Sequence, residues 1–266
     1  MGQKGEAMTE EVLLMEKEGD ICTVTINRPH RRNALNLELL YRLGDTFNAL
    51  KDDKDIRVVV LRGAGGKAFS SGIDLQNVDE VKVTQEDNPI NYAMGSVISY
   101  PRPVIAMIYG AATGAGCDLA VACDLRIAAD TAVMGINPVR IGRVYPPAGV
   151  RRLINVVGLS QAKELFFTGR FIDAHRAKEI GLVDHVVAAE ELPSFTYALA
   201  REIADSAPLA VSTTKTIFDR LLKHQRLSPE DENEILALID IVERSEDARE
   251  GRLAFIGKRK PRFLGR

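Results

Sequence analysis

The sequence predicts an α/β fold followed by a helical C-terminal region, and two patterns indicate this. From about residue 11 to 190, short apolar stretches typical of strands alternate with longer stretches of helical periodicity. From about residue 191, the helical pattern continues without intervening strands. The chain has 266 residues, of which 45% are hydrophobic, so it can bury a sizeable core. We therefore divide it into a flexible tail (1–10), an α/β core (11–190) and a C-terminal helical region (191–266).

The elements follow from hydrophobic periodicity, taken in chain order. The first strand has the alternation of a half-buried strand, with apolar residues at Cys22, Val24 and Ile26. A helix follows, and its apolar face is formed by Leu39, Leu40, Leu43, Phe47 and Leu50. Further strands are predicted at 57–62, 103–109, 125–129 and 182–187. Helices of the C-terminal region are predicted at 192–206, 210–224, 229–245 and 246–256.

A stretch of small residues after the predicted strand 103–109 is the most informative part of the chain. It begins at Gly110 and leads into a buried helix. The first N–H groups of a helix lack intrahelical partners and lie at the positive end of the helix dipole. Gly114 and Gly116 flank Ala115, so a ligand oxygen can approach this backbone closely. The turn can therefore stabilise negative charge that develops on an oxygen.

A second segment of the same kind favours chemistry over tight packing as the explanation. Residues 67–75 follow the apolar stretch 58–61 and place small residues before an expected helix start. Two backbone N–H groups, one near Ile73 and one near Ala115, would then converge on one oxygen. Such a pair forms an oxyanion hole, in which each donor contributes about 10²–10³-fold in rate.

Composition argues against several classes of function. The net charge of −2 does not give the broad basic surface that nucleic-acid binding requires. No apolar run approaches the ~20 residues of a membrane span, and the first residues lack a signal-peptide core. The four histidines show no metal-ligand spacing, and the three cysteines lie in apolar segments, as free thiols of a reducing compartment do. We therefore expect a cytoplasmic protein that binds no metal, membrane or nucleic acid.

Several short motifs occur in a specific order and spacing. They are Thr25–Pro29 with Asn33–Leu35, Ala68–Leu75, Gly114–Leu119 with Cys123–Asp124, Gly142–Gly149, Ala162–Leu165 and Gly181–Val183. Each is weak alone, but together they resemble the crotonase (enoyl-CoA hydratase/isomerase) superfamily over nearly the whole chain. The resemblance implies a crotonase-like spiral of ββα repeats. It also implies that the C-terminal helical region is a trimerisation region, in homotrimers that can pair into hexamers.

The resemblance further implies an acyl-CoA substrate. Superfamily members stabilise the thioester enolate with two backbone N–H groups, which by motif position belong here to Ile73 and Ala115. Because CoA is part of the substrate, no separate cofactor is implied. The residues expected to contact the acyl-CoA are Arg28, Ala68, Ser70, Ser71, Gly72, Asp74, Leu75, Gly114, Asn137 and Lys258. Lys258 is the best candidate for a phosphate contact in a basic tail that could otherwise be a solvated terminus. Residues 81–89 are expected to form a mobile loop beside the acyl pocket.

Two positions depart from the hydratases of this superfamily, which use two glutamates to add water to an enoyl thioester. The first glutamate falls at Asp118, which is one methylene shorter. The second falls at Pro138, which has no titratable group. General acid–base catalysis needs a donor or acceptor within hydrogen-bond reach, so ordinary hydratase activity is not expected.

Residues 135–149 instead resemble the methylmalonyl-CoA decarboxylase branch. They carry the Asn-Pro-Val run 137–139 followed by Tyr145, and the segment 255–261 also resembles that branch. One position departs from it: the branch can carry a histidine where this chain has Ile73, which offers only its backbone N–H.

Decarboxylation of a malonyl-type thioester needs no base, because the loss of CO2 itself generates the enolate. Tyr145 could hydrogen-bond the substrate carboxylate or donate the later proton, and packing beside Pro146 and Pro147 is the alternative. Asp118 could cap the helix start or, in an apolar site, relay a proton. The predicted function is an acyl-CoA lyase, with Ile73, Ala115, Asp118 and Tyr145 as the residues that carry the reaction.

Two alternatives stay open. The first is a hydratase or isomerase of broad acyl-CoA specificity that uses Asp118 and water. The second is a CoA-binding protein without chemistry of its own, which the two intact turns at Ile73 and Ala115 disfavour.

Overall fold

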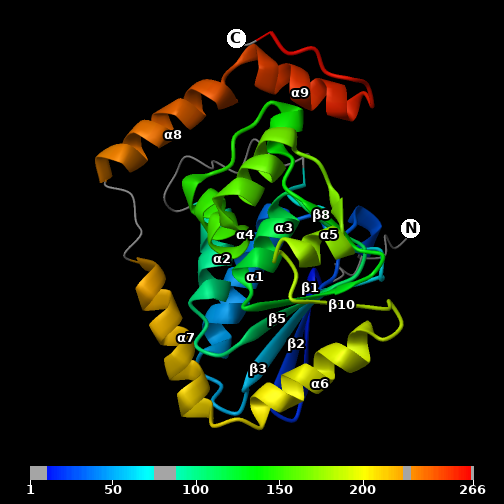
Figure 1. Cartoon of the computed structure of the whole chain (residues 1–266), viewed down its shortest axis with the longest axis vertical. Helices are drawn as coiled ribbons and strands as arrows, with labels where there is room; N and C mark the ends of the chain where they lie inside the picture. The colour runs from blue at the N-terminus through cyan, green and yellow to red at the C-terminus, as the bar shows by residue number, and fades with distance from the viewer. Residues whose placement is uncertain (1–10, 75–87, 224–228, 265–266) are drawn as a thin grey trace, which may run out of the picture.

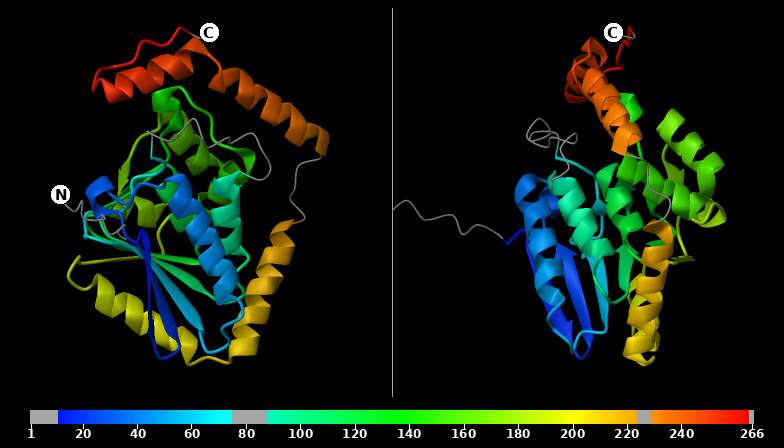
Figure 2. Two further views of the ribbon diagram at one scale, coloured as in Figure 1. Left: turned by 180° about the vertical axis from the view of Figure 1, so that it is seen from behind. Right: turned by 90° about the vertical axis from the view of Figure 1, so that its left-hand side faces the viewer.

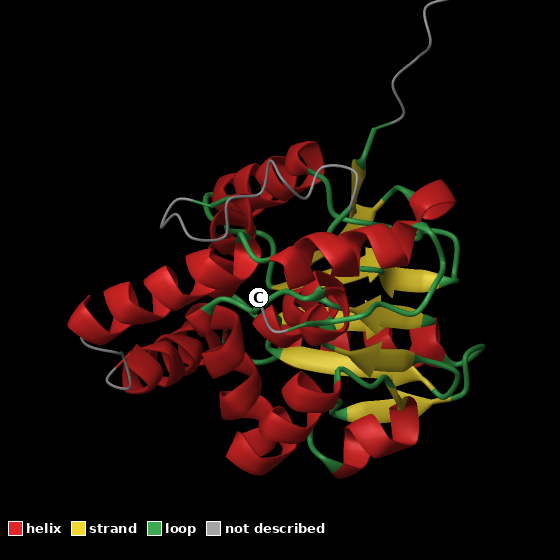
Figure 3. Ribbon diagram, turned by 90° about the horizontal axis from the view of Figure 1, so that it is seen from above, coloured by secondary structure: helices red, strands yellow, loops and turns green. Residues whose placement is uncertain are grey.

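The computed structural model describes residues 11–74, 88–223 and 229–264, which form two β-sheets with helices packed around them (Figure 1). Seen from above, the strands are grouped together and helices lie on their outer sides (Figure 3). The predicted tail 1–10 lies outside the described residues.

The larger sheet has six strands in the order β1-β2-β3-β5-β7-β10. All its strand pairs are parallel except β1 with β2. Its strands are β1 (Leu13–Glu18), β2 (Ile21–Ile26), β3 (Val58–Gly63), β5 (Val104–Ile108), β7 (Leu125–Ala129) and β10 (His185–Val187).

The smaller sheet has the order β4-β6-β8-β9, with β4, β6 and β8 parallel and β9 antiparallel to β8. Its strands are β4 (Ala68–Ser70), β6 (Ala111–Thr113), β8 (Val133–Gly135) and β9 (Ile172–Asp173). In each of the successive pairs β3/β4, β5/β6 and β7/β8, the first strand belongs to the larger sheet and the second to the smaller sheet. This repeat confirms the predicted spiral of ββα turns.

Helices connect and cover the strands. The described helices are α1 (Leu37–Leu50), α2 (Pro89–Ile98), α3 (Ala115–Ala122), α4 (Pro147–Thr168), α5 (Ala174–Glu179), α6 (Leu192–Ala204), α7 (Pro208–Lys223), α8 (Pro229–Glu243) and α9 (Glu246–Ile256). Two short 3-10 helices, η1 (Pro29–Arg31) and η3 (Pro138–Ile141), lie in loops. Over the described ranges, no helix is both long and apolar enough to cross a membrane.

Both faces of the inner strands β2, β3 and β5 are buried, which explains why β3 and β5 are nearly continuous apolar runs. In β3, Val58 and Val60 pack in a cluster with α6, whereas Val59 and Leu61 pack in the main core with α1 and α2. Because successive side chains of a strand point to opposite faces, an uninterrupted apolar run can cover both layers. Helix α6, which we expected in a separate C-terminal region, is therefore part of the core.

Local pairing corrects two predicted boundaries. The small-residue stretch after Gly110 is not all turn, because residues 111–113 pair with β4 and β8. The helix start expected after the segment 67–75 lies outside the described residues, and within that segment Ile73 forms a parallel bridge with Leu35. The predicted strand 182–187 is shorter because the N–H groups of residues 182 and 183 donate to Ala177 at the end of α5.

The last three helices lie along the outside of the molecule (Figure 2). They carry large exposed apolar residues: Leu209, Ile217, Phe218, Leu221, Leu222, Leu238, Ile241, Leu253, Phe255 and Ile256. Apolar area of this extent is typical of a surface that another protein covers.

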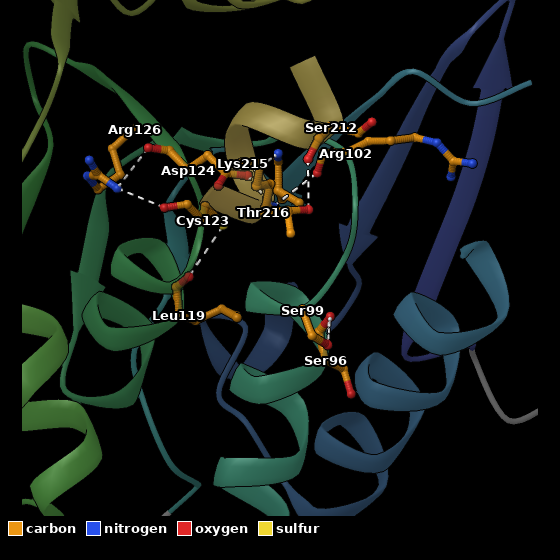
Figure 4. A network of polar contacts seen from close by, with 11 residues as sticks. Ser96, Ser99, Arg102, Leu119, Cys123, Asp124, Arg126, Ser212, Lys215 and Thr216 are labelled. Atoms are coloured by element: carbon orange, nitrogen blue, oxygen red, sulfur yellow. Dashed lines mark hydrogen bonds and ion pairs between the residues drawn. The ribbon is translucent and has the colours of Figure 1, made fainter. Parts of the chain in front are cut away.

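Asp124 attaches α7 to the core (Figure 4). Its Oδ2 accepts hydrogen bonds from the Val104 backbone N–H at 2.7 Å and from Lys215 Nζ on α7 at 2.6 Å. The same ammonium donates to the Arg102 carbonyl oxygen at 3.0 Å. One carboxylate thus joins the start of β5, the start of β7 and α7.

We predict that Asp124→Ala lowers the free energy of unfolding by about 2 kcal/mol, because it leaves an N–H and an ammonium without their acceptor. Hydrogen exchange of α7 should accelerate at the same time. Chemical denaturation and exchange mass spectrometry measure the two effects, with the exposed Asp130→Ala as the matched control. Equal stability of the two variants would contradict this role of Asp124.

Candidate active site

A cavity of about 340 Å³ opens where the two small-residue turns meet. Its walls come from both turns, from the segment between β8 and α4, and from the C-terminal helices. The lining residues are Arg32, Ser71, Gly72, Ile73, Ile90, Thr113, Gly114, Ala115, Asn137, Pro138, Ile141, Arg143, Val144, Tyr145, Pro146, Phe171, Glu243 and Phe255. Seven of the predicted site residues are among them: Ser71, Gly72, Ile73, Gly114, Ala115, Asn137 and Tyr145.

The two turns touch at Gly72. This glycine has φ of +93°, and a β-carbon on it would lie 2.8 Å from the Thr113 carbonyl oxygen and 3.2 Å from the Ala115 nitrogen. Any other residue would force the turns apart and strain the backbone. Pairing of β4 with β6, together with a hydrogen bond from Thr113 Oγ1 to the Ser71 carbonyl oxygen at 3.2 Å, holds them in contact.

The backbone N–H groups of Ile73 and Ala115 are both available to a ligand. In the bridge between residues 35 and 73, the bonds run from Leu35 N to Gly72 O and from Asp74 N to Leu35 O, which leaves Ile73 N unused. Ala115 is the first residue of α3, so its N–H has no intrahelical acceptor. Within the described part of the chain, neither N–H donates to another backbone group. Two donors beside one cavity are the components of an oxyanion hole.

Asp118 is one of a buried ion pair, which the sequence did not reveal. Arg152 Nε donates to Oδ1 at 2.8 Å and its Nη2 to Oδ2 at 2.6 Å, and the Asp118 side chain is 1% exposed. The apolar surroundings that we expected for Asp118 are therefore wrong. Because one guanidinium engages both carboxylate oxygens, Asp118 helps to fix α3 against α4, and it does not line the cavity.

Tyr145 stands next to this pair. A β-carbon at Gly149 would lie 2.2 Å from the Tyr145 ring and 3.2 Å from Asp118 Oδ2, so glycine leaves the room in which the ring and the carboxylate approach each other. The ring also packs on Phe166, with the ring centroids 5.7 Å apart. Tyr145 thus packs on Phe166 and also lines the cavity, and its role in the reaction stays a prediction.

The Tyr145 hydroxyl is buried and makes no hydrogen bond of ordinary geometry with the described residues, although the Asp118 carboxylate lies beside the ring and acts on the pKa of the hydroxyl. Burial, and then the negative charge of Asp118, raise the pKa of Tyr145 well above its ordinary value. The phenol therefore keeps its proton at neutral pH and can donate a hydrogen bond to a ligand. A buried unpaired hydroxyl costs free energy, so its presence at a cavity wall points to a ligand that completes it.

Pro138 and Asn137 line the cavity at the position where the hydratases of the superfamily carry their second glutamate. Pro138 lines the cavity as the first residue of η3. Asn137 Oδ1 lies 3.5 Å from the position that a β-carbon of Gly114 would take, so its amide is close to the oxyanion turn. This wall offers an amide and no acid.

Four predicted contact residues lie behind the cavity and not on its wall. Arg28 Nη2 binds Asp74 Oδ2 at 3.0 Å, and both side chains are nearly buried. Ser70 Oγ accepts a hydrogen bond from the Gly72 N–H at 3.3 Å, and the Ala68 carbonyl oxygen accepts one from Asn33 at 2.7 Å. These groups hold the first turn in shape. A contact of Arg28 with the acyl-CoA stays a prediction, and its guanidinium is bound to Asp74 and to the Ala34 carbonyl oxygen.

Lys258 follows α9 and is exposed, with a left-handed φ of 49°. Nothing in the described residues tests its predicted phosphate contact. Leu75 and residues 81–87 of the predicted mobile loop lie outside the described residues.

Cys117, the neighbour of Asp118, is not expected to act as a nucleophile. All three cysteines are free and buried. Burial raises the pKa of Cys117, the neighbour of Asp118, to about 12, so its thiol is not a nucleophile at neutral pH.

Sequence reasoning also missed a charged pair in the cavity wall. Arg143 Nε donates to both carboxylate oxygens of Glu243, at 3.0 and 2.9 Å, and its Nη2 also binds Oε2. The two residues are 100 positions apart in the chain. The only sequence signal was the presence of two arginines, Arg140 and Arg143, in the segment 135–149, which is otherwise uncharged.

The fold agrees with comparisons to known proteins. The family model for enoyl-CoA hydratase/isomerase matches residues 16–266, and the chain belongs to this family, the crotonase superfamily. It is an acyl-CoA enzyme of that class.

Three similar proteins differ in the activity that their names give. Enoyl-CoA hydratase domain-containing protein 2 of Mus musculus is 36% identical over 253 residues, covering 92% of this chain and 85% of that protein. Carnitinyl-CoA dehydratase of Escherichia coli (strain K12) is 33% identical over 264 residues, covering 96% and 99%. A structure of methylmalonyl-CoA decarboxylase complexed with 2S-carboxypropyl CoA has a TM-score of 0.91 at 30% identity, covering 97% and 100%.

We predict that a bound thioester places its carbonyl oxygen about 3 Å from both Ile73 N and Ala115 N. A crystal structure with a non-hydrolysable acyl-CoA analogue measures the two distances. A thioester oxygen that meets neither nitrogen would refute the oxyanion hole.

Proposed function

We propose that this protein decarboxylates a short malonyl-type acyl-CoA, similar to methylmalonyl-CoA. In this reaction the bond between Cα and the carboxylate carbon breaks and CO2 leaves. The electron pair of that bond forms the thioester enolate, whose oxygen accepts hydrogen bonds from the N–H groups of Ile73 and Ala115. Cα then takes up a proton to give the shorter acyl-CoA.

The observation that carries the proposal is that Tyr145 lines the oxyanion cavity and that its buried hydroxyl has no hydrogen-bond partner among the described residues. A phenol that keeps its proton can orient the substrate carboxylate before the loss of CO2, or donate the proton to Cα after it. The Asn137 amide is a second neutral group on the same wall. Decarboxylation needs these functions and needs no carboxylate base.

Hydration or isomerisation is the second candidate, and the names of two relatives favour it. Both reactions need a group that moves a proton to or from carbon. Asp118 is bound at both oxygens by Arg152, and position 138 is a proline. Glu243 is the one carboxylate among the described cavity residues, and Arg143 holds it. A CoA-binding role without chemistry is less consistent with two free N–H donors that meet at one cavity.

We also propose a homotrimer, or a hexamer of two trimers, in the cytoplasm. The apolar sides of α7, α8 and α9 support self-association, since they expose large side chains such as Phe218 and Ile241. The free cysteines suit a reducing compartment. Light scattering of the purified protein measures the oligomer mass.

A substrate screen tests the proposed reaction. We expect CO2 release from methylmalonyl-, ethylmalonyl- or malonyl-CoA, and hydration of crotonyl-CoA at least about 10²-fold slower than by a true hydratase, because one acid–base group is missing. Mass spectrometry of the thioester products distinguishes the reactions. Fast hydration of crotonyl-CoA without decarboxylation of any malonyl thioester would refute the lyase proposal.

Tyr145→Phe tests the residue that supports the proposal. We expect kcat for decarboxylation to fall about 100-fold or more while CoA binding is nearly unchanged, because the hydroxyl acts during the reaction and the ring is retained. Steady-state kinetics and calorimetry with free CoA give the two quantities. Asp118→Asn is the comparison variant: a large loss there with an unaffected Tyr145→Phe would move the proton transfer to Asp118.

A further inference from the structure

The Arg143–Glu243 pair has no task in the reaction as proposed, although it lines the same cavity. Arg143 follows η3, and Glu243 is the last residue of α8. The two side chains are 22% and 15% exposed, so both charges have lost most of their hydration. Such a pair at the wall of a ligand cavity is more costly than two apolar residues of the same size, which points to a role in recognition.

The guanidinium of Arg143 has a free edge. Its side edge, formed by Nε and Nη2, is occupied by the Glu243 carboxylate. The other edge is formed by the two Nη atoms and can bind a second carboxylate with two parallel hydrogen bonds. Among the described residues, Nη1 of Arg143 donates no hydrogen bond to another group. The cavity wall therefore offers N–H donors that a ligand can satisfy.

The surroundings favour an anionic ligand at this edge. Ile141 and Phe255 line the cavity together with Arg143, and neither provides an acceptor side chain. A neutral ligand would leave these buried N–H donors without acceptors, so the site disfavours it strongly. A carboxylate that extends to this edge accepts hydrogen bonds from them. The preference would thus be for acyl groups that carry a negative charge.

We propose that Arg143 binds the free carboxylate of the acyl group and so makes the enzyme specific for carboxylated short acyl-CoA thioesters, with Glu243 as its positioning residue. This inference rests on the proposed function and names the residue that recognises its substrate class. Tyr145 and Arg143 then have different roles. The Tyr145 phenol acts in the transition state, and the Arg143 guanidinium binds the substrate.

Glu243 also makes this recognition compatible with decarboxylation. A lone cation would stabilise the substrate carboxylate and oppose its conversion to neutral CO2. Glu243 binds the side edge of Arg143 and largely neutralises its charge. The substrate carboxylate is then held by the N–H donors of Arg143 without facing a full net positive charge. Glu243 is thereby expected to affect the rate of CO2 loss more than the binding.

Binding of two thioethers measures the recognition without turnover. 2S-carboxypropyl CoA and 2-methylpropyl CoA differ in the carboxylate, and neither has the thioester carbonyl that decarboxylation requires. We expect the carboxylated ligand to bind the unaltered protein at least about 10-fold more tightly, and Arg143→Leu to remove this difference, as expected for hydrogen bonds to a charged group. Isothermal titration calorimetry gives both affinities.

Arg140→Leu is the matched control, because Arg140 is an exposed arginine of η3 that does not line the cavity. It should keep the preference for the carboxylated ligand, and thermal unfolding should show that both variants are folded. An unaltered protein without this preference, or an Arg143→Leu variant that weakens both ligands equally, would overturn the inference. A preference that persists in an enzyme inactive on malonyl thioesters would refute only the proposed function.

Glu243→Gln tests the positioning residue. With the neutralising charge removed, we expect the carboxylated ligand to bind as tightly or more tightly, while kcat for decarboxylation falls about 10-fold or more. A merely structural role would lower the affinity for both thioethers as well. A variant with unchanged kcat would show that Glu243 does not tune the charge of Arg143.

Discussion

The site depends on the contact between two backbone turns that carry no reactive side chain. Gly72 packs against the segment from Thr113 to Ala115 so closely that one added carbon would separate the turns. That contact places the N–H groups of Ile73 and Ala115 at one cavity, and the pairing of β4 with β6 maintains it. Since backbone donors are fixed by the fold itself, they stabilise a developing oxyanion without reorganising during the reaction.

Paired charges form the second constraint around the cavity. Three carboxylates at or near its wall are each bound by an arginine, in the pairs Arg28–Asp74, Arg152–Asp118 and Arg143–Glu243. A buried carboxylate that is bound in this way stabilises the structure only while its partner is present. The pairs therefore hold the turns, α3, α4 and α8 in place, and among the described residues they leave no cavity carboxylate without an arginine partner. This distribution favours enolate stabilisation over acid–base chemistry.

The sequence predicted the elements whose patterns are local. The alternation in residues 21–26 and the helical face from Leu39 to Leu50 correspond to β2 and α1, because each period reflects burial on one side of a single element. The predicted secondary structure or region was wrong where contacts with residues distant in the chain determine the structure of a segment. Residues 111–113 form a strand because they pair with β4 and β8, and α6 is part of the core because it covers the second face of the larger sheet.

By itself, the sequence determined the superfamily and the absence of an acid at position 138, and it predicted the two backbone N–H donors that the structure places at one cavity. These features reside in the order of short motifs and in residue size, which a linear reading retains. Only the tertiary structure decided how the charged residues around the site are paired. Asp118 pairs with Arg152, 34 residues away in the chain, and Arg143 pairs with Glu243, 100 residues away. Ion pairs between distant residues leave no periodic pattern in the chain, and their formation depends on how the helices pack.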